Sequence, residues 1–355
     1  MPLVFNCETY SALCRMPNKH IILGIKSKET RLYTSLNDIP EDASGFIVAP
    51  FLSSRQIPTF LFEGIETTSL PLPQEPTEVA EGHAKSICSQ EKYATAFEYI
   101  KRAIDAKTVQ KAVLARSEDI SGLAVDINKL FIKACHTYPH CYVALVDVPG
   151  HGQWLTATPE LLYKTDVDHM GHTTALAGTM PWTDIEDGIS WSGKNLEEQR
   201  MVEEFIMSQL KNSSISFTTE TPHTVKAGNL AHLKTDFTLD ADNHSPIEII
   251  RLLHPTPAVA GVPRNKAIDI IREAEGADFR QYYAGFTGFI NNEEHHTACF
   301  VSLRLLCNKA NNLTLYAGGG ILPQSSMNQE WSETKLKLGI MKRLLGCQKH
   351  TEQHI

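Results

Sequence analysis

Carboxylates occupy positions of two amphipathic helices where the spacing calls for hydrophobic residues. The first helix is predicted over 195–211. At about 100° per residue, its apolar arc consists of Met201, Val202, Phe205 and Ile206. Glu198 falls near the centre of this arc, where a carboxylate is costly to bury unless a cation or hydrogen bonds compensate for its charge. The alternative is a helix end at which Glu198 stays in contact with water.

The second helix is predicted over 327–345, and its buried stripe is expected to consist of Leu336, Ile340, Met341 and Leu344. Glu330, Glu333 and Lys337 lie on the same stripe, one or two turns upstream. Glu333 and Lys337 are also an i,i+4 pair, which contributes only about 0.2–0.5 kcal/mol on an exposed helix. That pairing explains the spacing but not why the pair faces the core.

These carboxylates suggest a metal site. Ser326 followed by Gln329 resembles a capping box, which would begin the second helix just before Glu330 and Glu333. Mg²⁺ is a hard cation that commonly takes one or two protein carboxylates and keeps several waters. Glu198 and Glu333 are therefore candidate ligands for Mg²⁺.

Lys111 is a charge within a predicted strand, 109–117. Alternation places it on one face with Val109, Val113 and Ala115. Loss of solvation lowers the pKa of a lysine, and a lysine with such a pKa can act as a general base. The alternative, which the sequence alone slightly favours, is a lysine whose stem packs while its ammonium reaches water.

Arg304 is a further charge in an apolar run, ACFVSLRLLC. If the run is one strand, one face is core and the other carries Arg304 in a mixed environment. A guanidinium binds carboxylates in a bidentate manner, so Arg304 is a candidate ligand-binding residue, with a structural salt bridge as an equal alternative. The glycines of YAGGGI (316–321) could let backbone N–H groups approach an anion, but no phosphate-loop motif accompanies them.

Composition restricts the function classes. The 355 residues are 42% hydrophobic and 21% charged, which is typical of a globular protein. The formal net charge of −8 argues against a general nucleic-acid or anionic-membrane binder. The first twenty residues lack the features of a secretory signal, and no apolar run is long enough to span a membrane. The eight cysteines form no CxxC pair, so reduced, packed thiols and a cytoplasmic location are expected.

The elements predicted from the pattern do not alternate strictly, which favours an α+β fold over a doubly wound sheet. Short strand-like runs precede a proline-rich stretch, LPLPQEP (70–76), that is the best linker candidate. Further strands follow it, together with helices near 91–106 and 264–275. Pro263 and Gly276 flank the second of these helices. We expect residues 1–80 to be a strand-rich part of the same fold as a catalytic core in 81–355.

Nine stretches, in this order, resemble the chorismate-utilising enzymes, which include isochorismate, salicylate, anthranilate and aminodeoxychorismate synthases. They are KAVLAR (111–116), ATPELL (157–162), LAGT (176–179), EEQRMV (197–202), LHPTPAVAGVP (253–263), YYAGFTG (282–288), FVSLR (300–304), YAGGGI (316–321) and EWSETKLK (330–337). The resemblance implies large antiparallel sheets packed together, with helices outside and the site in a cleft between the sheets.

The resemblance also implies a role for each matching residue. Lys111 would activate water and Glu160 would be the general acid. Glu198 and Glu333 would bind Mg²⁺, with Glu330 adjacent through water. The expected substrate-binding residues are Gly178, Thr179, His254, Tyr283, Arg304, Gly318 and Lys337.

The expected reaction is the Mg²⁺-dependent isomerisation of chorismate to isochorismate by water attack at C2 with loss of the C4 hydroxyl. Ala177 stands where aminodeoxychorismate synthases carry a nucleophilic lysine, so water is the expected attacker. A salicylate synthase, which would go on to eliminate pyruvate, is the alternative. The product would serve menaquinone or siderophore synthesis. We expect no nucleic-acid or membrane partner, and a monomer or weak homodimer.

Overall fold

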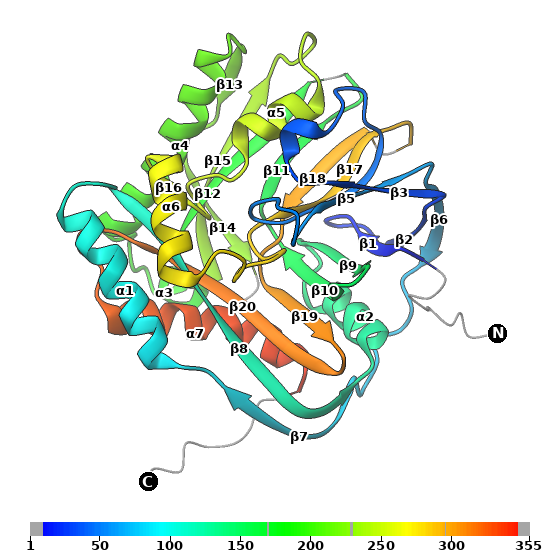
Figure 1. Ribbon diagram of the computed structural model, residues 1–355, viewed down its shortest axis with the longest axis horizontal. Coiled ribbons are helices and arrows are strands. Elements are labelled where there is room, and N and C mark those ends of the chain that lie inside the picture. Colours follow the sequence, from blue (N-terminus) through cyan, green and yellow to red (C-terminus); the bar gives the residue numbers. More distant parts are fainter. Residues whose placement is uncertain (1–9, 169, 228–229, 295, 347–355) are drawn as a thin grey trace.

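The computed structural model describes residues 10–168, 170–227, 230–294 and 296–346, and its strands form two antiparallel sheets (Figure 1). Sheet A has ten strands, in the order β16 (Gly261–Val262), β8 (Lys111–Val125), β20 (Asn312–Ile321), β19 (Leu305–Lys309), β10 (Gly152–Thr158), β9 (Tyr142–Val148), β1 (Ala12–Arg15), β2 (Ile21–Lys26) and β6 (Glu66–Pro71), with β7 (Ala80–Ile87) paired to β8.

Sheet B also has ten strands. Their order is β13 (Phe217–Thr219), β15 (Leu230–Leu239), β12 (Gly171–Pro181), β11 (Leu161–Thr165), β18 (His296–Val301), β17 (Phe286–Asn292), β4 (Gly45–Ala49), β5 (Thr59–Glu63) and β3 (Glu29–Tyr33), with β14 (His223–Ala227) paired to β15. The predicted α+β fold with large antiparallel sheets is therefore confirmed.

Helices cover the two sheets. They are α1 (Gln90–Asp105), α2 (Ile127–Thr137), α3 (Trp182–Glu186), α4 (Gly193–Asn212), α5 (Pro246–Leu253), α6 (Arg264–Glu275) and α7 (Met327–Leu344), with a 3₁₀ turn, η1, at Leu36–Asp38. The four helices that the sequence predicts, α1, α4, α6 and α7, begin and end within two residues of the expected positions. α2 and α5 were not predicted, although Asp126 and Ser245 cap their first turns.

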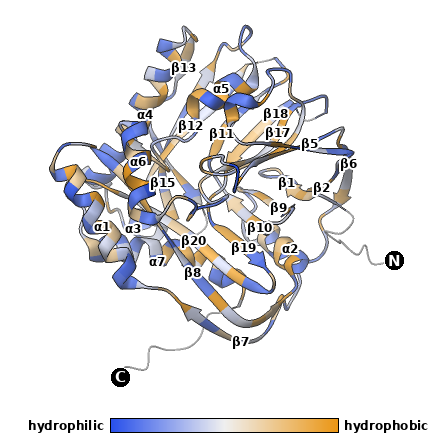
Figure 2. Cartoon of the chain, in the orientation of Figure 1, coloured by the Kyte–Doolittle hydropathy of each residue, from blue (hydrophilic) through white to orange (hydrophobic). Residues whose placement is uncertain are grey.

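The core has two parts, one on each face of sheet A. Between the sheets, Phe46, Phe237 and Phe289 of sheet B share a buried cluster with Leu114 and Tyr142 of sheet A. On the other face of sheet A, a second cluster joins the strands to α2 and α7. Figure 2 shows mixed hydrophobic and hydrophilic residues along the helices, as expected for helices with one face on a sheet and the other in water.

The run around Arg304 is not one strand, which corrects the sequence-based prediction. β18 ends at Val301 in sheet B, and β19 begins at Leu305 in sheet A. The chain therefore crosses between the sheets within three residues. Arg304 lies in this crossover and has a φ of +47°, a left-handed conformation that is uncommon for a residue with a side chain. It owes its position to the crossover, not to strand alternation.

The proline-rich stretch joins two strands of the same sheet. Its first residues, Leu70 and Pro71, are paired in β6 at the edge of sheet A, where a proline can be accommodated. No regular element covers 72–79, as the prolines predict, and β7 then pairs with β8.

The six described cysteines, Cys14, Cys88, Cys135, Cys141, Cys299 and Cys307, are free thiols, and all except Cys88 are buried. The prediction of reduced, mostly packed thiols is therefore confirmed for these six cysteines. Cys7 and Cys347 lie outside the described residues. Within the described parts of the chain, no helix combines the length and apolar character that a membrane span requires.

Candidate active site

A cavity lies where sheet A, sheet B and two helices meet. The space inside it, including its opening to solvent, is about 770 Å³. β12, β15 and β20 contribute to its wall, and side chains from α4 and α7 project into it. Eight of the predicted site residues line it: Glu160, Gly178, Thr179, Glu198, Tyr283, Arg304, Gly318 and Lys337.

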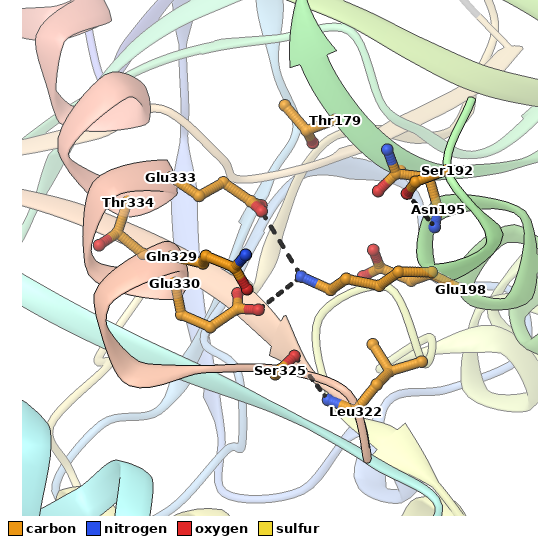
Figure 3. Close-up of polar contacts among 12 residues, drawn as sticks. Thr179, Ser192, Asn195, Glu198, Leu322, Ser325, Gln329, Glu330, Glu333 and Thr334 are labelled. Atoms are coloured by element: carbon orange, nitrogen blue, oxygen red, sulfur yellow. Dashed lines mark hydrogen bonds and ion pairs between the residues drawn. The ribbon is translucent and has the colours of Figure 1, made fainter. Parts of the chain in front are cut away.

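The three predicted metal ligands come from two helices that face each other. Figure 3 shows Glu330 and Glu333 projecting from α7 towards the side where Glu198 projects from α4. Glu330 is fully buried, and the Glu198 side chain is only 13% exposed. The alternative of a wet helix end is therefore wrong for Glu198.

Lysines compensate these buried charges. Lys111 Nζ is 2.9 Å from Glu198 Oε1, and Lys337 Nζ is 2.8 Å from Glu333 Oε1. Burial alone would raise the pKa of Glu198, but the ammonium groups around it outweigh burial and lower that pKa. Glu198 is therefore ionised at neutral pH. Burial and the repulsion of Glu333 together raise the pKa of Glu330.

The glycine run is part of β20 and not a phosphate loop. Gly318, Gly319 and Gly320 pair with Ala115, Leu114 and Val113 of β8. Their missing side chains leave room for the site. A Cβ on Gly320 would lie 2.3 Å from Glu198 Oε1, and one on Gly319 would lie 3.0 Å from Glu330 Oε2.

Lys111 and Glu160 are both shielded from water. Lys111 is fully buried at the start of β8, which corrects the preferred interpretation that its ammonium reaches solvent. It reaches the cavity through its contact with Glu198 and is not itself among the lining residues. Glu160 lies in the turn between β10 and β11 and is 3% exposed. Burial raises its pKa to about 8, against the opposing effect of Lys111 and Lys337.

Arg304 is held by a histidine that the sequence analysis missed. Arg304 Nη2 is 3.1 Å from His232 Nε2, and His232 Nδ1 is 3.1 Å from the carbonyl oxygen of Gly178. Burial, Arg304 and Lys337 lower the pKa of His232 to about 3, so the ring is neutral. A neutral ring that donates from Nδ1 to Gly178 accepts from Arg304 at Nε2. The ion pairs among the described residues do not include Arg304, so the salt-bridge alternative is not found.

Among the predicted substrate-binding residues, His254 is the one that does not line the cavity; Glu330 and Glu333 of the predicted metal site do not line it either. Its ring packs edge-on against Phe286, and its Nε2 is 3.1 Å from the carbonyl oxygen of Phe51. Burial lowers its pKa to about 4. His254 does not line the cavity, so the prediction that it binds substrate is not supported. The cavity histidine is His232, in a strand that also carries Lys234 and Asp236, so no local pattern in the sequence distinguished it.

The chemistry of the donor set suits a hard divalent cation, but the oxygens of the three carboxylates do not all lie within 4.8 Å of one another in this structure. All three candidate ligands are carboxylates, the oxygen donors that Mg²⁺ prefers. Glu330 Oε2 is buried and has no hydrogen-bond partner among the described residues. A buried carboxylate oxygen without a partner lowers the stability of the fold unless a cation binds it or a water molecule donates a hydrogen bond to it.

Comparison with known proteins places the chain in a family. Residues 55–346 match the family model described as chorismate binding enzyme. The isochorismate synthase EntC of Escherichia coli K12 is 32% identical over 248 residues, which is 67% of this chain and 63% of EntC. The chain thus aligns with somewhat less than two thirds of that relative. It belongs to the family of chorismate-binding enzymes.

Solved structures show the same fold. A putative 2,3-dihydroxybenzoate-specific isochorismate synthase, DhbC from Bacillus anthracis, gives a TM-score of 0.82 at 24% identity, covering 97% of this chain and 98% of DhbC. Anthranilate synthase component I from Streptococcus pneumoniae gives a TM-score of 0.67 at 17% identity, covering 90% of this chain and 83% of that protein. Since the first is named an isochorismate synthase and the second an anthranilate synthase, the fold alone does not select the reaction.

Proposed function

We propose that the protein is an isochorismate synthase, which converts chorismate to isochorismate by adding water at C2 and releasing the C4 hydroxyl. The observation that carries this proposal is a buried lysine and a buried carboxyl at the same site: Glu160 lines the cavity, and Lys111 lies behind its wall in contact with Glu198, which also lines it. The wall at Ala177 offers no nucleophilic atom, which favours water over an enzyme nucleophile. The similarity to EntC supports the same reaction.

The two groups divide the proton transfers. Lys111 is the base that takes a proton from the attacking water, for which its ammonium must first release the proton with which it pairs with Glu198. Glu160, protonated at neutral pH because its pKa is raised to about 8, donates a proton to the departing hydroxyl. The ring double bonds shift between these two events, so that atoms and charges balance without a redox cofactor.

The remaining residues bind the two carboxylates of the substrate. Arg304 and Tyr283 hold the enolpyruvyl carboxylate, with the Gly318 backbone beside them. Gly178, Thr179 and Lys337 border the ring. Glu198 and Glu333, with Glu330 through water, would hold Mg²⁺, and the bound ion would offset the negative charge of the ring carboxylate.

Product identification tests the proposal. After chorismate is added to the protein with Mg²⁺, NMR should show isochorismate, and excess EDTA should abolish its formation until Mg²⁺ is restored. Accumulation of fluorescent salicylate would instead identify a salicylate synthase. Formation of anthranilate in the presence of ammonium would identify an aminating enzyme. Thermal stabilisation by ATP, but not by chorismate with Mg²⁺, would contradict every chorismate-based function.

The glycine run gives a second test. In Gly320→Ala the new methyl group would displace the Glu198 carboxylate and contact Lys111 Cε, which lies 2.9 Å from the added Cβ. Because misplacement of about 1 Å can cost about 10²-fold in rate, chorismate turnover should fall by about that factor. Gly339→Ala in α7 is the control, since nothing lies within 4 Å of its added Cβ and alanine favours a helix. Equal turnover in the two variants would contradict the proposed role of Glu198.

A further inference from the structure

Lys194 is a lysine in the candidate metal site that the proposed mechanism does not use. It lies in the first turn of α4, one turn before Glu198. Its Nζ donates a hydrogen bond to Glu330 Oε1 and lies 3.8 Å from Glu333 Oε2. Figure 3 shows the partners of these contacts, Glu330 and Glu333, on the opposite side of the site from Glu198. One ammonium group therefore contacts two of the three candidate ligands.

The electrostatics agree with this geometry. Burial alone would lower the pKa of Lys194, but Glu330, Glu333 and, more weakly, Glu198 outweigh burial and raise that pKa. The ammonium is a cation held by the same carboxylates that would hold Mg²⁺. Lys194 and a metal ion held by these carboxylates, directly by Glu333 or through water by Glu330, compete for the same oxygens.

The side chain has a route out of the site. It is 20% exposed, while its partner Glu330 is fully buried. A lysine stem has four rotatable bonds, so the ammonium can move towards solvent without movement of α4.

We propose that Lys194 is an internal counter-ion that occupies the carboxylate cluster while the site holds no metal and leaves the cluster when a divalent cation binds. This inference rests on the proposed metal site. Lys194 is a positioning residue: it keeps Glu330 and Glu333 together in the absence of metal and reduces the apparent affinity for Mg²⁺. If the metal-accepting arrangement is about 10% populated, the apparent dissociation constant is raised about tenfold.

Calorimetric titration of Mg²⁺ into the substrate-free protein tests the competition. Lys194→Gln should bind Mg²⁺ about tenfold more tightly than the wild type. Its melting temperature without metal should fall, because Glu330 and Glu333 lose their counter-ion, and saturating Mg²⁺ should restore it. Lys342→Gln is the matched control: Lys342 is 26% exposed and pairs with the buried Glu118, away from the cavity. It should lose stability with no change in Mg²⁺ affinity.

Chemical labelling tests the displacement in the unmutated protein, so it does not depend on the folding of a variant. Acetylation of Lys194, measured by mass spectrometry of its peptide, should increase when Mg²⁺ is added, while that of Lys342 stays constant. Unchanged or reduced labelling of Lys194, or unchanged Mg²⁺ affinity in Lys194→Gln, would overturn the inference and leave the metal site intact. Absence of Mg²⁺ binding in both proteins would overturn the metal site itself.

Discussion

Replacement of Lys111 by methionine should lower chorismate turnover by about 10²- to 10⁴-fold, the usual contribution of a general base. Lys111 is fully buried, and methionine fills a similar volume without a group that accepts a proton. The measurement is the rate of isochorismate formation at saturating chorismate and Mg²⁺. Retention of more than about a tenth of the wild-type rate would remove Lys111 as the base.

Lys111→Met should also lower the free energy of unfolding, and this loss has to be distinguished from loss of the catalytic base. Removing Lys111 leaves Glu198 without the ammonium that lies 2.9 Å away, and loss of one partner of a buried pair typically costs about 3–5 kcal/mol. Lys342→Met removes the partner of another buried carboxylate, Glu118, and should lose stability but keep turnover. Mg²⁺ binding by Lys111→Met would show that the carboxylate cluster remains assembled.

Glu160→Gln is expected to have the second large effect, again about 10²- to 10⁴-fold on turnover. Glu160 must be protonated to donate, and its pKa is raised to about 8. On the alkaline side of the pH–rate profile, the wild-type rate should therefore stay constant up to the pKa of Glu160 and fall as pH rises through about 8. The variant's residual rate should lack that decline, because glutamine does not titrate. An unchanged rate, or a decline that persists in the variant, would rule out Glu160 as the acid.

The same substitution should have the opposite effect on stability. Between about pH 4.5 and about 8 the folded wild type holds a proton on Glu160 that the unfolded chain has lost, so its stability falls as pH rises across that window. Glutamine carries no such dependence. The melting temperature of Glu160→Gln relative to the wild type should increase through this window and level off above it, which distinguishes lost chemistry from misfolding.

Charge at an apolar position was the useful signal in the sequence. It identified Glu198, Glu330, Glu333 and Lys337, although the 3.6-residue period of their two helices is weak and Leu336, expected on the buried stripe of α7, is exposed. The helix start at Ser326 was also predicted correctly, but Ser326 Oγ donates to the Gln329 side chain and does not cap a backbone N–H. Elements are predictable from local spacing, whereas their hydrogen bonds depend on neighbours.

Other residues could not be found in this way. Glu160 lies in a turn, which has no hydrophobic periodicity, so a glutamate there is not unusual in the sequence. Its burial comes from packing between the sheets. Lys194 is an ordinary lysine in a first helical turn, and its partner Glu330 is 136 residues away in the chain. His232 and His254 are both buried, and their surroundings, not their local sequence, decide which of them borders the cavity.

The crossover at 302–304 has a consequence for how the cavity can evolve. Because three residues connect β18 of one sheet directly to β19 of the other, the gap between the sheets beside Arg304 has a fixed width. Neither sheet can slide far over the other without changing the left-handed backbone of Arg304. Substitutions that let the cavity accept a larger molecule should therefore lie on the side away from this crossover, near α4 and α7. The helices can shift there without straining the connection between the two sheets.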